Sequence, residues 1–179
     1  QERINNYNKT FPNYPPSLFL SHNQIIGLWV MGQNYKTKSS LYGAYPHGYL
    51  DRIYSLFPKT DKTLHLFSGS IEDDCDCVDL HNGIDAETMG DILPNNYYTL
   101  ILSDPPYSIE DCDHYGCCMI KRNNVFKECY KILKKDGILI WLDQVLPNYK
   151  KIEFDIIARI GMVKSTNHRF RVITIFQKI

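Results

Sequence analysis

The chain has 179 residues, 44% of them hydrophobic, which is enough to bury the core of one compact domain. Its 20 basic and 20 acidic residues cancel, so no overall positive field favours nucleic acid, and such binding must come from a local patch. The longest apolar runs, at 25–31 and 137–142, are far shorter than the ~20 residues of a membrane helix, so we expect a soluble protein with no membrane partner, cytoplasmic or nucleoid-associated.

The N-terminal segment is rich in Asn, Tyr and Pro. Three prolines oppose regular structure there: Pro12, Pro15 and Pro16. We therefore predict an extended arm over roughly residues 1–24 and a short strand at 25–31. As domains, we expect 1–40 to pack as an arm on a single domain of residues 41–179.

The next segments alternate between helix and strand patterns. Apolar residues at helical spacing predict a helix at 50–57 that ends at Pro58. A short strand at 63–67 runs directly into the small-residue turn 68–70, where the backbone of an α/β protein can approach a ligand closely. A second strand at 77–80 contains Asp79, an acid suited to accept hydrogen bonds from a ribose diol.

The most distinctive motif is Asp104-Pro105-Pro106-Tyr107, which follows an apolar run at 98–102. That run predicts a buried strand that ends at a stiff loop. Because the two prolines fix φ and lack N–H donors, nearby carbonyl groups are free to face a cleft. An acid, a carbonyl group and an aromatic ring are thus held together, as in a binding site.

Directly after the motif we predict a polar lid or target-binding loop at 109–122. A helix at 125–133 should follow and end at the basic residues and glycine of 134–137. The remaining predicted elements are a strand at 138–142, a helix at 152–160 and a closing strand pair at 162–164 and 171–176. Together these elements imply a three-layer α/β domain.

Six cysteines raise the question of metal or disulfides: Cys75, Cys77, Cys112, Cys117, Cys118 and Cys129. Their spacing does not match the usual zinc pairs, which favours free thiols in a reducing compartment, with a zinc site as the minor alternative. Three local basic patches are candidates for nucleic-acid contact: Lys36 with Lys38, Lys121 with Arg122, and His168-Arg169 with Arg171.

Several of these segments match a known family in order. Phe67-Ser68-Gly69-Ser70 after a strand, Asp79, and Asp104-Pro105-Pro106-Tyr107 after the next clear strand resemble class I S-adenosylmethionine-dependent amino-methyltransferases of the DNA adenine-N6 or cytosine-N4 type. The helix-to-strand turn 133–139 and the upstream segment 43–46 are also similar. The resemblance covers roughly residues 40–179 and extends to short phage or prophage members with the same layout.

The resemblance implies a Rossmann-like methyltransferase fold, a mostly parallel sheet with a C-terminal antiparallel hairpin, and S-adenosylmethionine as cofactor. It implies a catalytic segment of Asp104, Pro105, Pro106 and Tyr107. The implied cofactor contacts are Tyr45, Pro46, Phe67, Ser68, Gly69, Asp79 and one of Asp85 and Asp91. Candidate contacts to a nucleic-acid substrate are Tyr115, Lys121, Arg122 and Arg169.

The chemistry explains the residue types of the motif. The lone pair of an exocyclic amine on a base is delocalised into the ring, so the site must hold the two N–H groups and localise that pair. Asp104 and the Pro105 carbonyl can accept these hydrogens, and Asp104 favours the positive charge that builds on nitrogen. Tyr107 can stack on a base that has left the duplex.

Two departures from the family pattern keep alternatives open. Phe67 and Asp79 are only twelve positions apart, which leaves little room for the usual helix after the glycine turn, and the turn has a single glycine. No segment is large enough for a separate target-recognition domain, so a protein partner is one possible source of specificity. DNA adenine N6 is the first choice of substrate, with an RNA base or a catalytically silent, partner-binding subunit as alternatives; protein glutamine is disfavoured because such enzymes show Asn in place of Asp104.

Overall fold

The computed structural model describes residues 1–32, 45–69, 71, 74–165 and 169–179. Its elements follow the chain in this order: α1 (Glu2–Thr10), β1 (Leu18–Ser21), β2 (Gln24–Met31), α2 (Tyr49–Leu56), β3 (Thr63–Leu66), β4 (Asp76–Val78), η1 (Leu80–Asn82), η2 (Met89–Asp91), β5 (Tyr98–Ser103), α3 (Ile109–Tyr115), α4 (Arg122–Ile132), β6 (Leu133–Asp143), β7 (Phe154–Lys164) and β8 (Phe170–Lys178). The elements predicted near β2, α2, β3, β4, β5, α4 and β6 are confirmed, although β6 begins directly after α4 and includes 134–137.

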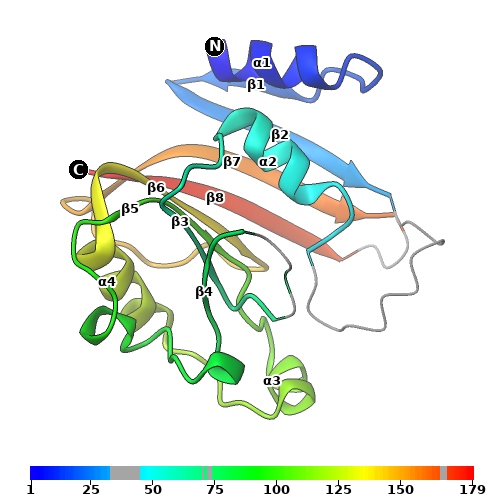
Figure 1. Cartoon of the computed structure of the whole chain (residues 1–179). Coiled ribbons are helices and arrows are strands. Elements are labelled where there is room, and N and C mark those ends of the chain that lie inside the picture. Colours follow the sequence, from blue (N-terminus) through cyan, green and yellow to red (C-terminus); the bar gives the residue numbers. More distant parts are fainter. Residues whose placement is uncertain (33–44, 70, 72–73, 166–168) are drawn as a thin grey trace.

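The strands form one sheet in the order β1-β2-β7-β8-β6-β5-β3-β4 (Figure 1). Parallel pairs join β2 to β7, β6 to β5, β5 to β3 and β3 to β4, whereas β1 with β2, and β8 with both β6 and β7, are antiparallel. The predicted C-terminal hairpin is confirmed as β7–β8. The sheet is nevertheless mixed and not mostly parallel, because the hairpin inserts β8 between β6 and β7 and β1 adds an antiparallel edge.

The first residues form a helix, so the prediction of an extended arm over residues 1–24 is wrong. Ile4 and Tyr7, one turn apart in α1, are buried, and the Tyr7 ring stacks on Trp29 of β2 with centroids 5.7 Å apart. This i, i+3 pair was hidden among Asn and Pro residues. A short helix of such composition is stabilised mainly by packing of its apolar side, which only the fold supplies.

The helix predicted at 152–160 is also wrong, because this segment belongs to β7. Ala158, Ile160 and Met162 alternate into the core with the period of a strand. An irregularity between Ile156 and Ala158 shifts the register against β8 and breaks the alternation. The apolar residues on either side of that shift then fall at spacings that mimic a helix.

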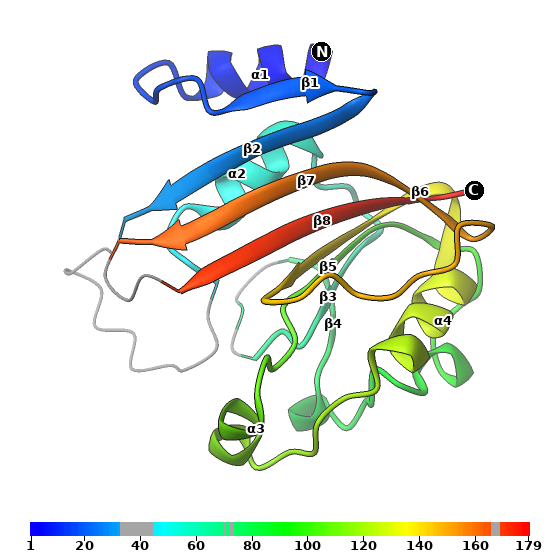
Figure 2. The ribbon, with the colours of Figure 1, turned by 180° about the vertical axis from the view of Figure 1, so that it is seen from behind.

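The helices cover the two faces of the sheet unequally. α1 and α2 lie over one face and α4 over the other, as a comparison of Figures 1 and 2 shows. On the side seen in Figure 2, no described helix covers β1, β2 and β7. Exposed apolar side chains on these strands and on β8 include Phe19, Leu28, Val30 and Phe170.

Several predicted features lie outside the described residues: the boundary between 40 and 41, the Lys36 and Lys38 patch, Gly43, Ala44, Ser70 and His168. No helix within the described ranges is both long and apolar enough to cross a membrane. The cysteines are free thiols, and in the part of the chain that the structure describes no three His, Cys, Asp or Glu side chains gather as metal ligands would.

Candidate active site

The segment Asp104–Tyr107 leaves the sheet at the carboxyl end of β5. Its two prolines carry the chain away from the sheet, since they cannot continue strand pairing. Ser108 then caps α3 by accepting a hydrogen bond of 3.2 Å from the Asp111 N–H. The irregular loop predicted at 109–122 is therefore wrong in its first half, where a Ser-x-x-Asp capping signal begins a helix.

The two segments that the sequence singled out follow neighbouring strands. Leu66 at the end of β3 pairs with Ser103 at the end of β5, so Phe67–Gly69 and Asp104–Tyr107 both leave the same edge of the sheet. In the sheet, β4 lies on one side of β3, and β5, which follows β4 in the chain, lies on the other side of β3. Such a reversal of strand order is where open α/β sheets bind ligands.

Asp104 is at the centre of this site. The Tyr107 hydroxyl donates a hydrogen bond to Asp104 Oδ1. Burial raises the pKa of Asp104 to about 6, although the Tyr107 hydrogen bond and the charge of Arg171 act against that rise. Burial and the charge of Asp104 raise the pKa of the Tyr107 hydroxyl well above its usual range. Near neutral pH, Asp104 is thus an ionised acceptor and Tyr107 a donor.

Charged groups from three further strands surround this pair. Arg171 of β8 places its Cζ atom 4.8 Å from the centroid of the Tyr107 ring. The pKa of Lys164, at the end of β7, is lowered by burial and by the charge of Arg171, and the charge of Asp104 opposes this shift. Asp143, the last residue of β6, raises the pKa of Asp104 by its negative charge. Asp104 therefore has both positively and negatively charged side chains around it.

An aromatic residue just before α2, Tyr45, and one at its start, Tyr49, form an aromatic wall beside Asp104. The rings of Tyr45 and Tyr49 stack with centroids 4.9 Å apart, and the Pro46 carbonyl accepts a hydrogen bond of 2.9 Å from the Tyr49 N–H. Burial is the main cause that raises the pKa of both hydroxyls well above their usual range, and the charge of Asp104 adds to it. Within the described residues, the buried Tyr45 hydroxyl has no hydrogen-bond partner.

The turn after β3 has an unusual backbone. Gly69 has a φ of +54°, which glycine adopts without steric cost, but Phe67 has a φ of +58°, which bulky residues rarely adopt. Ser68 between them is buried, and its Oγ has no hydrogen-bond partner among the described residues. The described residues between β3 and β4 form no helix, in keeping with the short spacing. Backbone strain of this kind tends to gather at functional sites.

Asp79 closes this turn from the end of β4. Its carboxylate accepts hydrogen bonds from the Gly69 N–H at 2.9 Å, the His81 N–H at 3.0 Å and the His81 ring at 2.8 Å. Burial acts to raise the pKa of Asp79, but these hydrogen bonds outweigh it and the pKa is lowered. The acid predicted to bind a ribose therefore contacts the predicted glycine turn directly.

The other two predicted cofactor acids have local partners. Asp85 Oδ1 accepts a hydrogen bond of 2.8 Å from the Glu87 N–H and so closes a turn. Asp91 ends η2, which is joined to α4 by a hydrogen bond of 2.8 Å from the Gly90 N–H to Glu128 Oε2. Both aspartates are exposed. The choice between them for an adenine amino group stays a prediction.

The two residues of the predicted basic patch at the start of α4 have different surroundings. Arg122 donates to both Asp143 oxygens, from Nε at 2.7 Å and from Nη2 at 3.2 Å, so its guanidinium is committed to an ion pair. The side chain of Lys121 is exposed, and the backbone N–H of Lys121 donates to Glu87 Oε1 at 2.9 Å. Tyr115 ends α3, and its side chain is not among those described.

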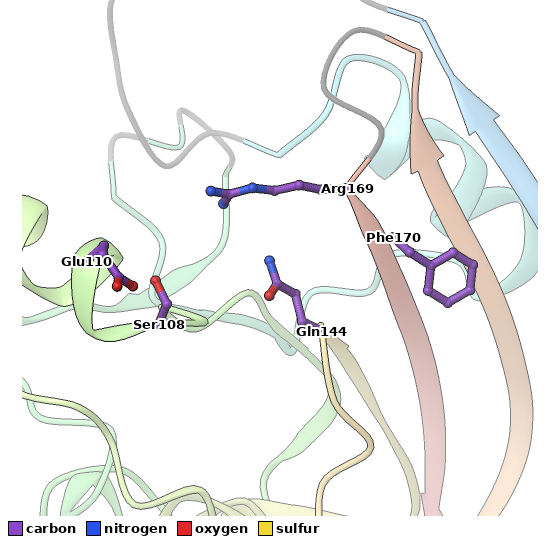
Figure 3. A pocket seen from close by; sticks show the side chains of 5 residues that line it. All are labelled: Ser108, Glu110, Gln144, Arg169 and Phe170. Atoms are coloured by element: carbon purple, nitrogen blue, oxygen red, sulfur yellow. The ribbon is translucent and has the colours of Figure 1, made fainter.

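A pocket of about 280 Å³ lies next to the motif (Figure 3). It is lined by Ser108, Glu110, Gln144, Arg169 and Phe170. In Figure 3 the Arg169 side chain extends toward Glu110 and Ser108, whereas the Phe170 ring points away from them. Arg169 Nη1 also lies 3.9 Å from Asp111 Oδ1. Of the predicted substrate contacts, Arg169 is the one that this pocket includes.

The residues around the β3 turn fit S-adenosylmethionine in their chemistry. The buried hydroxyls of Ser68 and Tyr45 find no partner in the described parts of the chain, which is costly unless a ligand completes them. An aspartate at the end of the adjacent strand is suited to hydroxyl groups of a ribose. That Phe67, Ser68, Gly69, Asp79 and Tyr45 hold the cofactor stays a prediction.

Three further residues belong to the site in the fold. Tyr49 and Asp143 had no predicted site role, and Arg171 was named only as part of a predicted basic patch. Tyr49 extends the aromatic wall, Asp143 supplies a buried charge and Arg171 covers the Tyr107 ring. A signal was present for Arg171, which shares a strand face with the core residues Ile173 and Ile175. Nothing in the sequence pairs β8 with the motif.

Comparison with known proteins finds distant likeness to solved structures. No protein-family model matches the chain, and no curated protein is found as a relative. Among solved structures, TrmN from Thermus thermophilus is 14% identical with a TM-score of 0.41, over 65% of this chain and 43% of that one. A proposed type 11 methyltransferase from Sulfolobus solfataricus is 16% identical with a TM-score of 0.41, over 76% of this chain and 94% of that one. The chain spans less than half the length of the first.

Proposed function

We propose that this protein is an S-adenosylmethionine-dependent methyltransferase that acts on an exocyclic amino group of a nucleic-acid base, with adenine N6 of DNA as the first choice and an RNA base as the second. The observation that carries this proposal is the position of Asp104–Tyr107 after β5, beside the strained Phe67–Gly69 turn after β3. Two segments that share a switch point are placed to bring a cofactor and a substrate together.

The chain supplies the groups that an amine needs. Ionised Asp104 accepts one amine hydrogen and the Pro105 carbonyl accepts the other, which localises the lone pair and favours positive charge on nitrogen. The Tyr107 ring stacks on the base once its hydroxyl releases Asp104. S-adenosylmethionine, when bound, would supply an electrophilic methyl group with a neutral thioether as its leaving group. The amine nitrogen that gains the methyl group releases one proton to solvent water.

The first experiment is calorimetric titration with S-adenosylmethionine, followed by radiolabelled methyl transfer to DNA, RNA and protein pools. We expect binding, transfer to a nucleic-acid pool and a loss of at least 100-fold in rate for Asp104→Ala, because both the acceptor and its charge are removed. Asp155→Ala, at an exposed position of β7, is the matched control and should retain full activity. Activity that survives Asp104→Ala would mean that the reacting amine is held elsewhere.

One observation favours a second candidate, a catalytically silent subunit that binds nucleic acid or a partner protein. Asp79 already accepts hydrogen bonds from the Gly69 N–H and from His81, and the described residues between β3 and β4 form no helix. A cofactor ribose would have to share the carboxylate with these contacts or displace them. Nucleic-acid binding without any heat of S-adenosylmethionine binding would favour this candidate. A protein partner that supplies target recognition is compatible with both proposals.

A further inference from the structure

Arg171 lies against the motif but makes no hydrogen bond to it. The residue is in β8, on the sheet face covered by α2, and its Cζ atom is 4.8 Å from the centroid of the Tyr107 ring. Its charge acts on Asp104, Tyr107 and Tyr49, which places the guanidinium among the central side chains of the site.

The guanidinium donors of Arg171 find no partner in the part of the chain that the structure describes. Among the described residues no hydrogen bond or ion pair to Arg171 is found, and its Nε atom is buried. Arginine carries five N–H donors, and a buried donor without a partner costs about 1–3 kcal/mol. In contrast, Arg122 satisfies Asp143 with two hydrogen bonds, and Arg159 donates to Gln24 at 2.6 Å.

We propose that Arg171 is a substrate-binding residue whose N–H groups donate to an acceptor atom of the nucleotide that is stacked at Tyr107, either on the edge of the base or on its phosphate. This inference rests on the proposed function for the identity of the ligand. Arginine suits the role because its planar guanidinium can stack on an aromatic ring while its N–H donors point outward in the plane of the guanidinium. An anionic or carbonyl oxygen, or a ring nitrogen, would accept hydrogen bonds from the donors that the described residues leave without a partner.

A purely electrostatic role is the alternative. Asp104 faces Tyr107, Arg171 of β8, Lys164 of β7 and Asp143 of β6, with Tyr49 from α2 nearby. In that case Arg171 would serve only to balance charge, and Arg171→Lys would replace it fully. If the guanidinium contacts the substrate, lysine restores the charge but neither the stacking geometry nor the fork.

The test measures nucleic-acid binding without cofactor, by fluorescence anisotropy at fixed salt concentration. The ligand is a labelled single-stranded oligonucleotide with one adenine in a thymine background, and its counterpart carries an abasic site at that position. For the adenine oligonucleotide, we expect Arg171→Met to raise Kd at least tenfold and Arg171→Lys to raise it about threefold. Arg159→Met removes an equal charge from the opposite face of the sheet and should stay within twofold.

The two oligonucleotides identify the acceptor. If the effect of Arg171→Met disappears on the abasic strand, the acceptor lies on the base; if it persists, the acceptor is a phosphate. Thermal unfolding of each variant shows whether the fold is kept, and Arg171→Lys carries the test if the methionine variant does not fold.

Equal Kd values for wild type, Arg171→Lys and Arg171→Met would overturn the inference, as would a wild type that does not bind the adenine strand. The proposed function is tested separately by methyl transfer. Arg171-dependent binding without transfer would keep the inference for a silent subunit, and transfer without Arg171 dependence would remove only the inference.

Discussion

Asp104 illustrates how a residue's chemistry depends on what surrounds it. Its type and its place after a strand were readable from the sequence, but its pKa of about 6 results from burial opposed by Tyr107 and Arg171. Such a carboxylate costs stability when it is ionised in the folded protein. A group held in this state at a site is more typical of function than of structure.

The pH dependence of Asp104→Asn measures this cost. Because the folded pKa lies at about 6 and the unfolded pKa near 3.8, the stability contributed by Asp104 is fully present below about pH 4 and is lost as the pH rises through 6. A difference of about 2 pKa units corresponds to at most about 3 kcal/mol. We therefore expect Asp104→Asn to match wild type near pH 4 and to be about 2–3 kcal/mol more stable at pH 8, in denaturant unfolding.

Asp155→Asn is the control for that experiment, since its exposed side chain should give a difference near zero at both pH values. A stability difference for Asp104→Asn that does not change with pH would show that Asp104 titrates normally in the folded state.

The end of β6 gives Arg122, a predicted substrate contact, a structural role. Asp143 is fully buried and accepts hydrogen bonds from Arg122, the Trp141 indole and the N–H groups of Gln144 and Val145. The ion pair joins the start of α4 to the carboxyl edge of the sheet. Arg122 is thereby a structural residue of the edge that carries the site.

Removal of Arg122 should therefore destabilise the protein. Arg122→Met leaves the buried Asp143 carboxylate without its cationic partner, and breaking a buried pair in this way costs about 3 kcal/mol or more. The neighbouring Lys121→Met removes the same charge at an exposed position and should change the free energy of unfolding by about 0.5 kcal/mol or less. The midpoint of urea unfolding at unchanged m-value checks both. Equal, small effects would mean that Arg122 is free to serve a substrate.

The N-terminal segment is part of the main core. α1 packs against α2, the Arg3 guanidinium donates to the Leu56 carbonyl at 2.6 Å, and Asn6 Nδ2 donates to the Ser55 carbonyl at 2.6 Å. Ile4 and Tyr7 belong to the same buried cluster as the central strands. The helix that precedes the sheet thus helps to hold α2, whose first turn carries the aromatic wall of the site.

Two tyrosines of this segment test its contribution. Tyr7 is 1% exposed and Tyr14 is 46% exposed, so Tyr7→Ala removes core packing and leaves a cavity, whereas Tyr14→Ala trims the surface. We expect a loss of about 3–4 kcal/mol for Tyr7→Ala and about 1 kcal/mol or less for Tyr14→Ala in thermal or denaturant unfolding. Two equally mild losses would indicate that the segment lies on the domain as an arm.

The sequence alone determined the local features: the buried β5 strand, the proline-stiffened Asp104–Tyr107 loop after it, the turn at Phe67–Gly69 and the α2 and α4 helices. These depend on short-range periodicity, on proline and on glycine, which act within a few residues. Only the tertiary structure decided that 154–164 is a strand, that α1 enters the core and that Arg171 covers Tyr107. Each of these depends on partners outside the segment itself, whose packing and charge no local pattern records.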